Sequence, residues 1–285
     1  MSVERVVDCT CDLGEGPVWH TGEDRLYWVD IDAGRLHRFD PATGTHDVAF
    51  ETRVVSGVTV QRDGSLLLFM DRGRVGHLVD GELVTVEQVV EQDEESRFND
   101  VIADPAGRVF CGTMPTDARG GRLHHLDTDG ATTLVADGVG IPNGMGFTRN
   151  YESCYFTETE ADTIYRYAYD ERTGELSARE RFVTTSDTPG LPDGMTVDAA
   201  GGVWSARWKG GCVVRYDASG TEVDRVDLPA EKVTSVAFGG PGLGRLYVTT
   251  GGGSARPEEG TGAGALFRLD PDVAGRPECR SAVDF

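Results

Sequence analysis

Short runs of hydrophobic and β-branched residues recur along the chain and alternate with polar positions, a pattern that is typical of β-strands. A segment that passes from polar to apolar residues appears six times, and a second β-type run begins about ten to twelve residues after the start of each. The six segments begin at Glu15, Ser56, Asn99, Asn143, Asp193 and Thr234. The period is about forty to fifty residues, and self-similarity at a fixed period indicates a repeat architecture.

Each unit contains about four short strands joined by hairpin turns. In the first unit, β-type runs at residues 26–29 and 35–40 precede a turn at 40–44, where proline fixes φ and glycine supplies φ > 0. Since no unit can bury a core alone, we expect one closed domain over residues 1–285. The predicted fold is all-β, a six-bladed β-propeller with four-stranded blades. A solenoid is the alternative, but it would need capping repeats that the sequence lacks.

Two local expectations complete the predicted fold. Residues 5–9 should form a strand that joins the sixth unit and closes the ring. The acidic stretch at 86–95 is the one candidate for a helix, and we interpret it as a loop.

The charge balance excludes some partners. The chain has 27 Lys and Arg against 48 Asp and Glu, a net charge of −21, so nucleic acids and anionic membranes would be repelled over most of the surface. Lys209 and Lys232 are the only lysines. Because concentrated salt screens the self-repulsion of an acidic surface, a salt-loving host is one hypothesis. The other hypothesis is an ordinary acidic enzyme whose few lysines reflect an arginine-biased genome.

The cysteines and the N-terminus suggest a compartment. Six cysteines are scattered without a CxxC pair, and Cys9 and Cys11 are too closely spaced for a convincing metal or disulfide framework. We therefore expect small buried packing residues in a reducing cytosol. The N-terminus shows no apolar signal region, and no stretch approaches the ~20 apolar residues of a membrane helix. The expectation is a cytoplasmic protein, either a monomer or a weak oligomer.

The repeated position predicts a ring of polar side chains. In a propeller the first strand of each blade lines the central channel, so the first residues of the six segments should converge on the axis. All six carry oxygen, and packed together without partners they would cost several kcal/mol each. A hard divalent cation would resolve this cost: Ca²⁺ or Mg²⁺, with Mn²⁺, Fe²⁺ or Zn²⁺ also possible. Water in the channel is the alternative. Glycine follows Glu15, Asn143 and Asp193, which would let the backbone turn tightly beside a crowded centre.

Substrate should bind on the face where the inner strands begin. The connections between second and third strands also emerge there, at 115–121, 207–211 and 250–264, beside entering loops at 91–98, 137–142 and 184–192. Arg97, two residues before Asn99, could offer a forked donor over the ring. A surface ion pair of Arg97 with Glu94 or Glu95 is the alternative.

Four motifs carry a family resemblance: residues 13–19 (LGEGPVW), 97–100 (RFND), 142–145 (PNGM) and 192–195 (PDGM). In this order they resemble the senescence marker protein, or regucalcin, and gluconolactonase family, over essentially the whole chain. The resemblance implies a six-bladed propeller that hydrolyses a sugar lactone, an aldonolactone such as gluconolactone or a pentonolactone, with one divalent metal on the axis. It implies that Glu15, Asn143 and Asp193 ligate the metal and that Arg97 and Asn99 contact substrate. Relatives also use an acidic residue in the loop matching 115–121, where Asp117 is a weak match.

The predicted reaction is hydrolysis of a cyclic ester, with Asp193 as general base and Arg97 and Asn99 stabilising the oxyanion. Other nucleophilic arrangements fit less well, because the chain has no GxSxG motif and no HExxH spacing. The six histidines are expected on strand surfaces or in turns, with His124 and His125 on opposite faces of one strand. Two rival functions remain: an esterase or organophosphate hydrolase on a related metal propeller, and a non-enzymatic propeller for metal binding or protein interaction.

Overall fold

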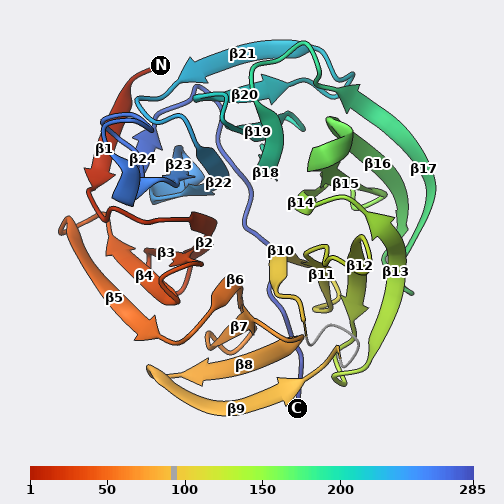
Figure 1. Ribbon diagram of the computed structural model, residues 1–285. Helices are drawn as coiled ribbons and strands as arrows, with labels where there is room; N and C mark the ends of the chain where they lie inside the picture. The colour runs from red at the N-terminus through yellow and green to blue at the C-terminus, as the bar shows by residue number, and fades with distance from the viewer. Residues whose placement is uncertain (91–94) are drawn as a thin grey trace.

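The computed structural model describes residues 1–90 and 95–285. Its strands form six four-stranded antiparallel sheets set radially around a central channel, which is a six-bladed β-propeller (Figure 1). The fold predicted from the repeats is therefore confirmed.

The strands run outward from the channel in chain order. Blade 1 contains β2 (Gly14–His20), β3 (Arg25–Asp30), β4 (Arg35–Asp40) and β5 (Thr45–Glu51). Blade 2 contains β6 (Val55–Val60), β7 (Leu66–Met70), β8 (Arg74–Val79) and β9 (Glu82–Gln88). Blade 3 contains β10 (Phe98–Ala103), β11 (Val109–Thr113), β12 (Gly121–Leu126) and β13 (Thr132–Val139). Blade 4 contains β14 (Pro142–Phe147), β15 (Ser153–Glu158), β16 (Thr163–Asp170) and β17 (Glu175–Thr184). Blade 5 contains β18 (Leu191–Val197), β19 (Val203–Trp208), β20 (Cys212–Tyr216) and β21 (Glu222–Asp227). Blade 6 contains β22 (Val233–Gly239), β23 (Arg245–Thr250), β24 (Leu266–Leu269) and β1 (Val3–Val7). Within residues 1–90 and 95–285, the short 3₁₀ helices are η2 (Thr159–Ala161), η3 (Pro241–Leu243) and η4 (Gly253–Ala255).

The N-terminal strand closes the ring. β1 pairs antiparallel with β24, with Val3 opposite Leu269 and Arg5 opposite Phe267. The closing strand covers residues 3–7 rather than the predicted 5–9. It lies two residues earlier because its pairing with β24 runs from Val3 to Val7. The predicted loop at 86–95 also needs correction: β9 extends to Gln88, while residues 91–94 lie outside the described residues.

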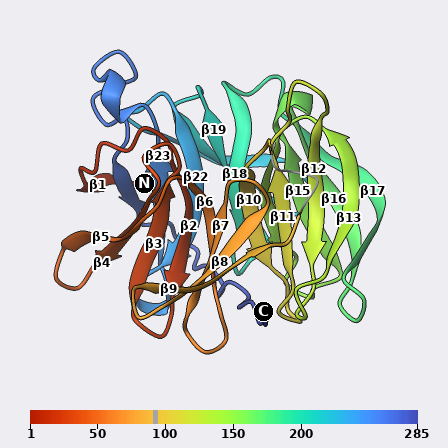
Figure 2. The same cartoon turned by 60° about the horizontal axis from the view of Figure 1, so that its bottom comes forward.

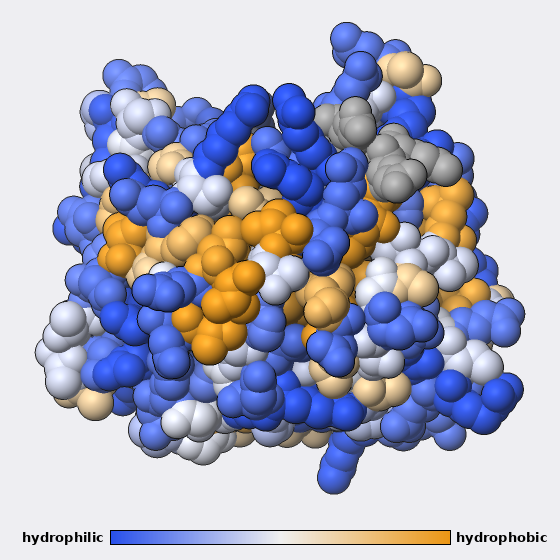
Figure 3. All heavy atoms as spheres, turned by 90° about the horizontal axis from the view of Figure 1, so that it is seen from below, coloured by the Kyte–Doolittle hydropathy of each residue, from blue (hydrophilic) through white to orange (hydrophobic). Residues whose placement is uncertain are grey.

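Packing between neighbouring blades holds the ring together. Among the described residues, six hydrophobic clusters fill the six interfaces between adjacent blades. At the closure, Trp19 of blade 1 stacks on Tyr247 of blade 6 with ring centroids 6.2 Å apart. Both faces of each sheet are thus covered, unlike a sheet with one wet face. On one side of the molecule, Figure 3 shows a mostly hydrophilic surface with hydrophobic residues gathered near its centre.

The inner strand of every blade carries a β-bulge near the repeated position. Each pairing of a first with a second strand shifts register there, for example between Asn143 and Met145 in β14 and between Pro192 and Met195 in β18. A bulge bends the strand and redirects the side chain beside it. The bulges therefore set how the ring residues face the axis.

The C-terminal segment closes one end of the channel. Residues 270–285 cross the ring in Figure 1, and their backbone bonds to first-to-second strand turns, such as Ala274 to Ala199 and Ala282 to Gly107. Figure 2 shows the chain end on the side opposite the projecting segment between β23 and β24. The C-terminal segment thus leaves open the opposite end of the channel, where the inner strands begin. No helix among the described residues is long and apolar enough to cross a membrane.

Candidate functional site at the propeller axis

Three of the predicted site residues come from different blades and meet at the open end of the channel. Glu15 lies in β2, Asn143 in β14 and Asp193 in β18. Asn143 and Asp193 are each 5% exposed. Their inner strands approach closely because glycine follows each residue: a Cβ on Gly144 would lie 2.6 Å from the Asp193 carbonyl oxygen. The glycines inferred from the sequence therefore allow the blades to converge.

A chain of hydrogen bonds fixes the two ring amides. Asn99 donates through Nδ2 to the Pro142 carbonyl at 2.9 Å and to Oδ1 of Asn143 at 3.2 Å. Asn143 in turn donates through Nδ2 to Oγ1 of Thr159 at 3.0 Å, and that hydroxyl donates to the Pro192 carbonyl at 2.8 Å. The Asn143 nitrogen is held by Thr159, and its oxygen accepts one hydrogen bond from Asn99, so the second lone pair of that oxygen is left for a cation.

The carboxyl groups of the site hold protons unusually strongly. Burial raises the pKa of Glu15 well above its ordinary value, and the negative charges of Asp193 and Asp100 raise it further. Burial followed by the charge of Asp100 raises the pKa of Asp193 in the same way. Burial also raises the pKa of Asp100 to about 6. Like charges crowded in a low-dielectric channel favour a bound cation or a proton over three free carboxylates.

A small cavity lies among the ring residues. Its lining consists of Glu15, Ile31, Ser56, Asn99, Asp100 and Asn143. The buried hydroxyl of Ser56 has no hydrogen-bond partner among the described residues. Buried polar atoms without a partner are rare, so this hydroxyl points to a ligand or water at the axis. The oxygen donor set fits a hard divalent cation.

Thr234 departs from the predicted ring. Its hydroxyl is fully buried, donates to the Gly14 carbonyl and lies 2.9 Å from Oγ1 of Thr249. It therefore joins blades 1 and 6, and it does not line the cavity.

Arg97 lies beside the ring, as the sequence predicts. Its Nη1 donates at 2.8 Å both to Oδ1 of Asn99 and to the Phe98 carbonyl. Burial lowers the pKa of Arg97, while the charges of Glu15 and Asp193 partly compensate. Among the described residues it forms no ion pair with Glu95, and Glu94 lies outside them. Arg97 thus lies beside the ring and, in the part of the chain that the structure describes, does not form the alternative surface pair with Glu95.

Two charged residues of the site were missed from the sequence. Asp100 follows Asn99 directly and lines the channel. Arg207, fully buried in β19, donates to the Pro189 and Gly190 carbonyls and so holds the loop that leads to Asp193. Asp100 could have been found within the RFND motif, whereas only the fold shows the contacts of Arg207. Asp117, the weak match for a substrate-contacting acid, is exposed.

Comparison with known proteins identifies the family. The model of the SMP-30/gluconolactonase/LRE-like region matches residues 13–252. The chain belongs to this family. It is 68% identical over 290 residues to a pentonolactonase of Haloferax volcanii, covering 99% of both chains. It is 35% identical over 254 residues to a 6-deoxy-6-sulfogluconolactonase of Pseudomonas putida, covering 87% of this chain and 86% of the relative.

The architecture agrees with solved members of the SMP-30/gluconolactonase/LRE-like family. The calcium-binding protein regucalcin of Agrobacterium tumefaciens superposes with a TM-score of 0.89 at 28% identity, over 97% of this chain and 96% of that chain. The family resemblance inferred from the four motifs is therefore confirmed.

The histidines depart from the expectation of strand surfaces and turns. His20, His37, His124 and His125 are at most 8% exposed. His124 and His125 do point to opposite faces of β12, but adjacent blades cover both faces of the sheet. The alternation was predicted correctly, and the wrong step was to assume that one face of each blade meets solvent.

Proposed function

We propose that this protein is a metal-dependent hydrolase of sugar lactones that opens an aldonolactone to the aldonic acid. The single observation that carries the proposal is the convergence of Glu15, Asn143 and Asp193 from three blades, at the end of the channel opposite the C-terminal segment. The 68% identity to a pentonolactonase and the 35% identity to a sulfogluconolactonase support lactone hydrolysis as the reaction class.

Glu15, Asn143 and Asp193 would hold one divalent cation. Two carboxylates and one amide leave coordination positions open, and such a cation polarises a carbonyl and lowers the pKa of water. Its identity among Ca²⁺, Mg²⁺, Mn²⁺, Fe²⁺ and Zn²⁺ is a matter for measurement. Regucalcin of Agrobacterium tumefaciens, described as calcium-binding, supports a divalent ion in this fold.

The residues around the cation would carry the remaining chemistry. Asp193 would accept the proton of the attacking water. Arg97 and Asn99, already hydrogen-bonded to each other, would orient the ring hydroxyls and stabilise the developing oxyanion. The proton would leave with the opened ring as its hydroxyl group.

The substrate would be a neutral sugar lactone with several hydroxyl groups. A pentonolactone is the preferred class, because the relative with 68% identity over the full chain is a pentonolactonase. The substrate would enter from the face opposite the C-terminal segment.

A substrate panel tests the proposal. Initial rates are measured for xylonolactone, arabinolactone, galactonolactone and gluconolactone, and for an aryl ester and an organophosphate, with each divalent cation in turn. Lactones should be preferred, and Asp193→Asn should lower their turnover by roughly 10²- to 10⁴-fold with metal still bound. A several-hundred-fold preference for the aryl ester or organophosphate would favour the rival hydrolase. Absence of turnover with every cation would favour a non-enzymatic propeller.

A further inference from the structure

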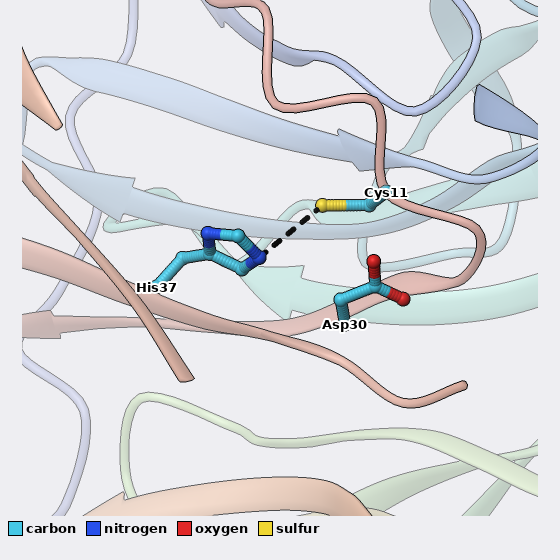
Figure 4. A group of neighbouring side chains, drawn as sticks. All are labelled: Cys11, Asp30 and His37. Atoms are coloured by element: carbon cyan, nitrogen blue, oxygen red, sulfur yellow. Dashed lines mark hydrogen bonds between the residues drawn. The ribbon is translucent and has the colours of Figure 1, made fainter. Parts of the chain in front are cut away.

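We propose that Cys9, Cys11, Asp30 and His37 form a second metal site, separate from the axis, that takes a thiophilic divalent cation such as Zn²⁺. The candidate ligands converge from the segment before β2, the end of β3, and β4. Ligand atoms of Cys11, Asp30 and His37 all lie within 4.8 Å of one another. Figure 4 shows these three side chains gathered around one point. Among the described residues this is the single group of three His, Cys, Asp or Glu side chains so arranged.

The distances fit a tetrahedral ion. Zinc–sulfur and zinc–nitrogen bonds of about 2.3 and 2.0 Å place a sulfur and a nitrogen ligand about 3.5 Å apart at tetrahedral angles. Sγ of Cys11 lies 3.6 Å from Nε2 of His37. Two sulfur ligands would lie about 3.8 Å apart, and Sγ of Cys9 and Cys11 are separated by 3.4 Å. Cys11, Asp30 and His37 would therefore be the three primary ligands, and Cys9, which lies outside the group within 4.8 Å, would rotate towards them as the fourth.

His37 is prepared to act as a ligand through Nε2. Its other ring nitrogen, Nδ1, lies 2.9 Å from Nε2 of His46, so a hydrogen bond there fixes the ring. Trp28 stacks against the imidazole with ring centroids 5.0 Å apart. A metal-bound histidine is usually oriented by such an outer hydrogen bond.

Asp30 can be a ligand without losing its present partners. Its two carboxylate oxygens accept the backbone N–H groups of Asp12 and Leu13, each at 3.1 Å. Each oxygen has a second lone pair that these bonds leave open. Asp30, Cys11 and His37 are at most 4% exposed, so the site is closed to solvent in the manner of a structural metal centre.

The site lies where the ring is closed. The Cys11 N–H donates to the Gly264 carbonyl at 2.8 Å, and the Gly253 N–H donates to the Cys11 carbonyl at 2.9 Å. A cation there would tie the segment after β1 and the loop of blade 6 to two strands of blade 1. Its binding would release thiol protons and stabilise the closed ring.

Cobalt absorption tests the site independently of lactone hydrolysis. Reduced, chelator-treated protein is first saturated with Mg²⁺, which occupies the oxygen site on the axis, and is then titrated anaerobically with Co²⁺. A thiolate ligand gives Co²⁺ a strong charge-transfer absorption that oxygen ligands do not. We expect one equivalent of this absorption and its loss when Zn²⁺ is added.

Variants separate the site from adventitious thiol binding. Cys11→Ser and Cys9→Ser should each weaken the Co²⁺ affinity at least about tenfold. Cys279→Ser, a half-buried cysteine in the C-terminal segment, is the matched control and should bind as wild type. Circular dichroism checks that each variant is folded. If both variants unfold, the wild-type protein still decides through the thiolate absorption itself, because oxygen ligands on the axis cannot produce it.

Three results would overturn the proposal. One is the absence of a thiolate absorption in folded, reduced wild-type protein. Another is an absorption that persists unchanged in folded Cys11→Ser. The third is a wild-type melting temperature that Zn²⁺ does not raise.

Discussion

Thr159 illustrates how one hydroxyl can organise a polar centre. It accepts a hydrogen bond from the Asn143 amide and donates one to the Pro192 carbonyl, so it links the entrances of blades 4 and 5. The amide of Asn143 is thereby oriented before any cation is present. Partners of this kind commonly matter almost as much as the ligands they hold.

Replacing Thr159 with valine keeps the shape and removes both hydrogen bonds. We expect the metal affinity or kcat to fall about 10- to 100-fold, because Asn143 loses the partner that orients its amide. The free energy of unfolding should fall by about 1–3 kcal/mol, since the Asn143 amide and the Pro192 carbonyl stay buried. Metal titration and urea unfolding measure the two effects.

Thr157 of β15, two residues before Thr159, provides the matched control. Its hydroxyl is fully buried and has no hydrogen-bond partner among the described residues. Thr157→Val should therefore leave the free energy of unfolding unchanged or raise it. Equal losses of metal affinity in the two variants would contradict the role given to Thr159.

The buried histidines predict a loss of stability in acid. Burial lowers the pKa of His124 to about 4, below the ordinary 6.5. As pH falls from 6.5 towards 4, His124 binds a proton in the unfolded chain but not in the native protein. The free energy of unfolding therefore decreases across this window. His124→Gln should lose less stability than wild type over the window, by roughly 2–3 kcal/mol at pH 4. Urea unfolding of both proteins at pH 7.5, 5.5 and 4.5 measures this, and parallel curves would contradict it.

The inner strands show how far the sequence could lead. The repeated positions predicted the propeller, the face of the site and the approach of Glu15, Asn143 and Asp193. The bulges that redirect these side chains could not be predicted, because a bulge depends on the register between two strands.

The histidine prediction failed for a related reason, and the contact between Cys11 and His37 could not be predicted either. Cys11 and His37 are 26 residues apart and meet only because blade 1 folds β4 against the segment that follows β1. Spacing along the chain contains no signal of this contact. The burial of His37 and His124 likewise depends on the neighbouring blade that covers each sheet face.

The C-terminal segment is an element with a measurable contribution to stability. Beyond Val273 it makes six backbone hydrogen bonds to the rest of the described chain, and Gln61 pairs with both the N–H and the carbonyl of Val283. At about 1 kcal/mol per bond, ending the chain after Val273 should cost several kcal/mol. The melting temperature should fall on the order of 10 °C, as scanning calorimetry would show.

A shorter truncation is the control for this prediction. Ending the chain after Val283 removes one of the six backbone bonds, that of Asp284, and should lower the melting temperature by only a few degrees. Equal melting temperatures for the full chain and the longer truncation would show that the segment does not hold the far end of the channel closed.

The acidic surface is a property of the whole molecule. A net charge of −21 repels itself at low ionic strength, and the Debye length falls to ~3 Å at 1 M salt. We therefore predict that the melting temperature rises between 0.1 M and about 3 M KCl, in line with the hypothesis of a salt-loving host. Equal stability in both solutions, measured by calorimetry, would remove that hypothesis and leave an ordinary acidic protein.

The central claim is that a cation sits on the axis between Glu15, Asn143 and Asp193. Anomalous diffraction from crystals grown with Mn²⁺ tests it most directly, because the anomalous signal locates the ion without reference to activity. The account predicts a peak within bonding distance of an oxygen of each of the three side chains, and its loss in Asp193→Ala crystals. An axis without a peak under these conditions, or a peak that none of the three side chains touches, would contradict it.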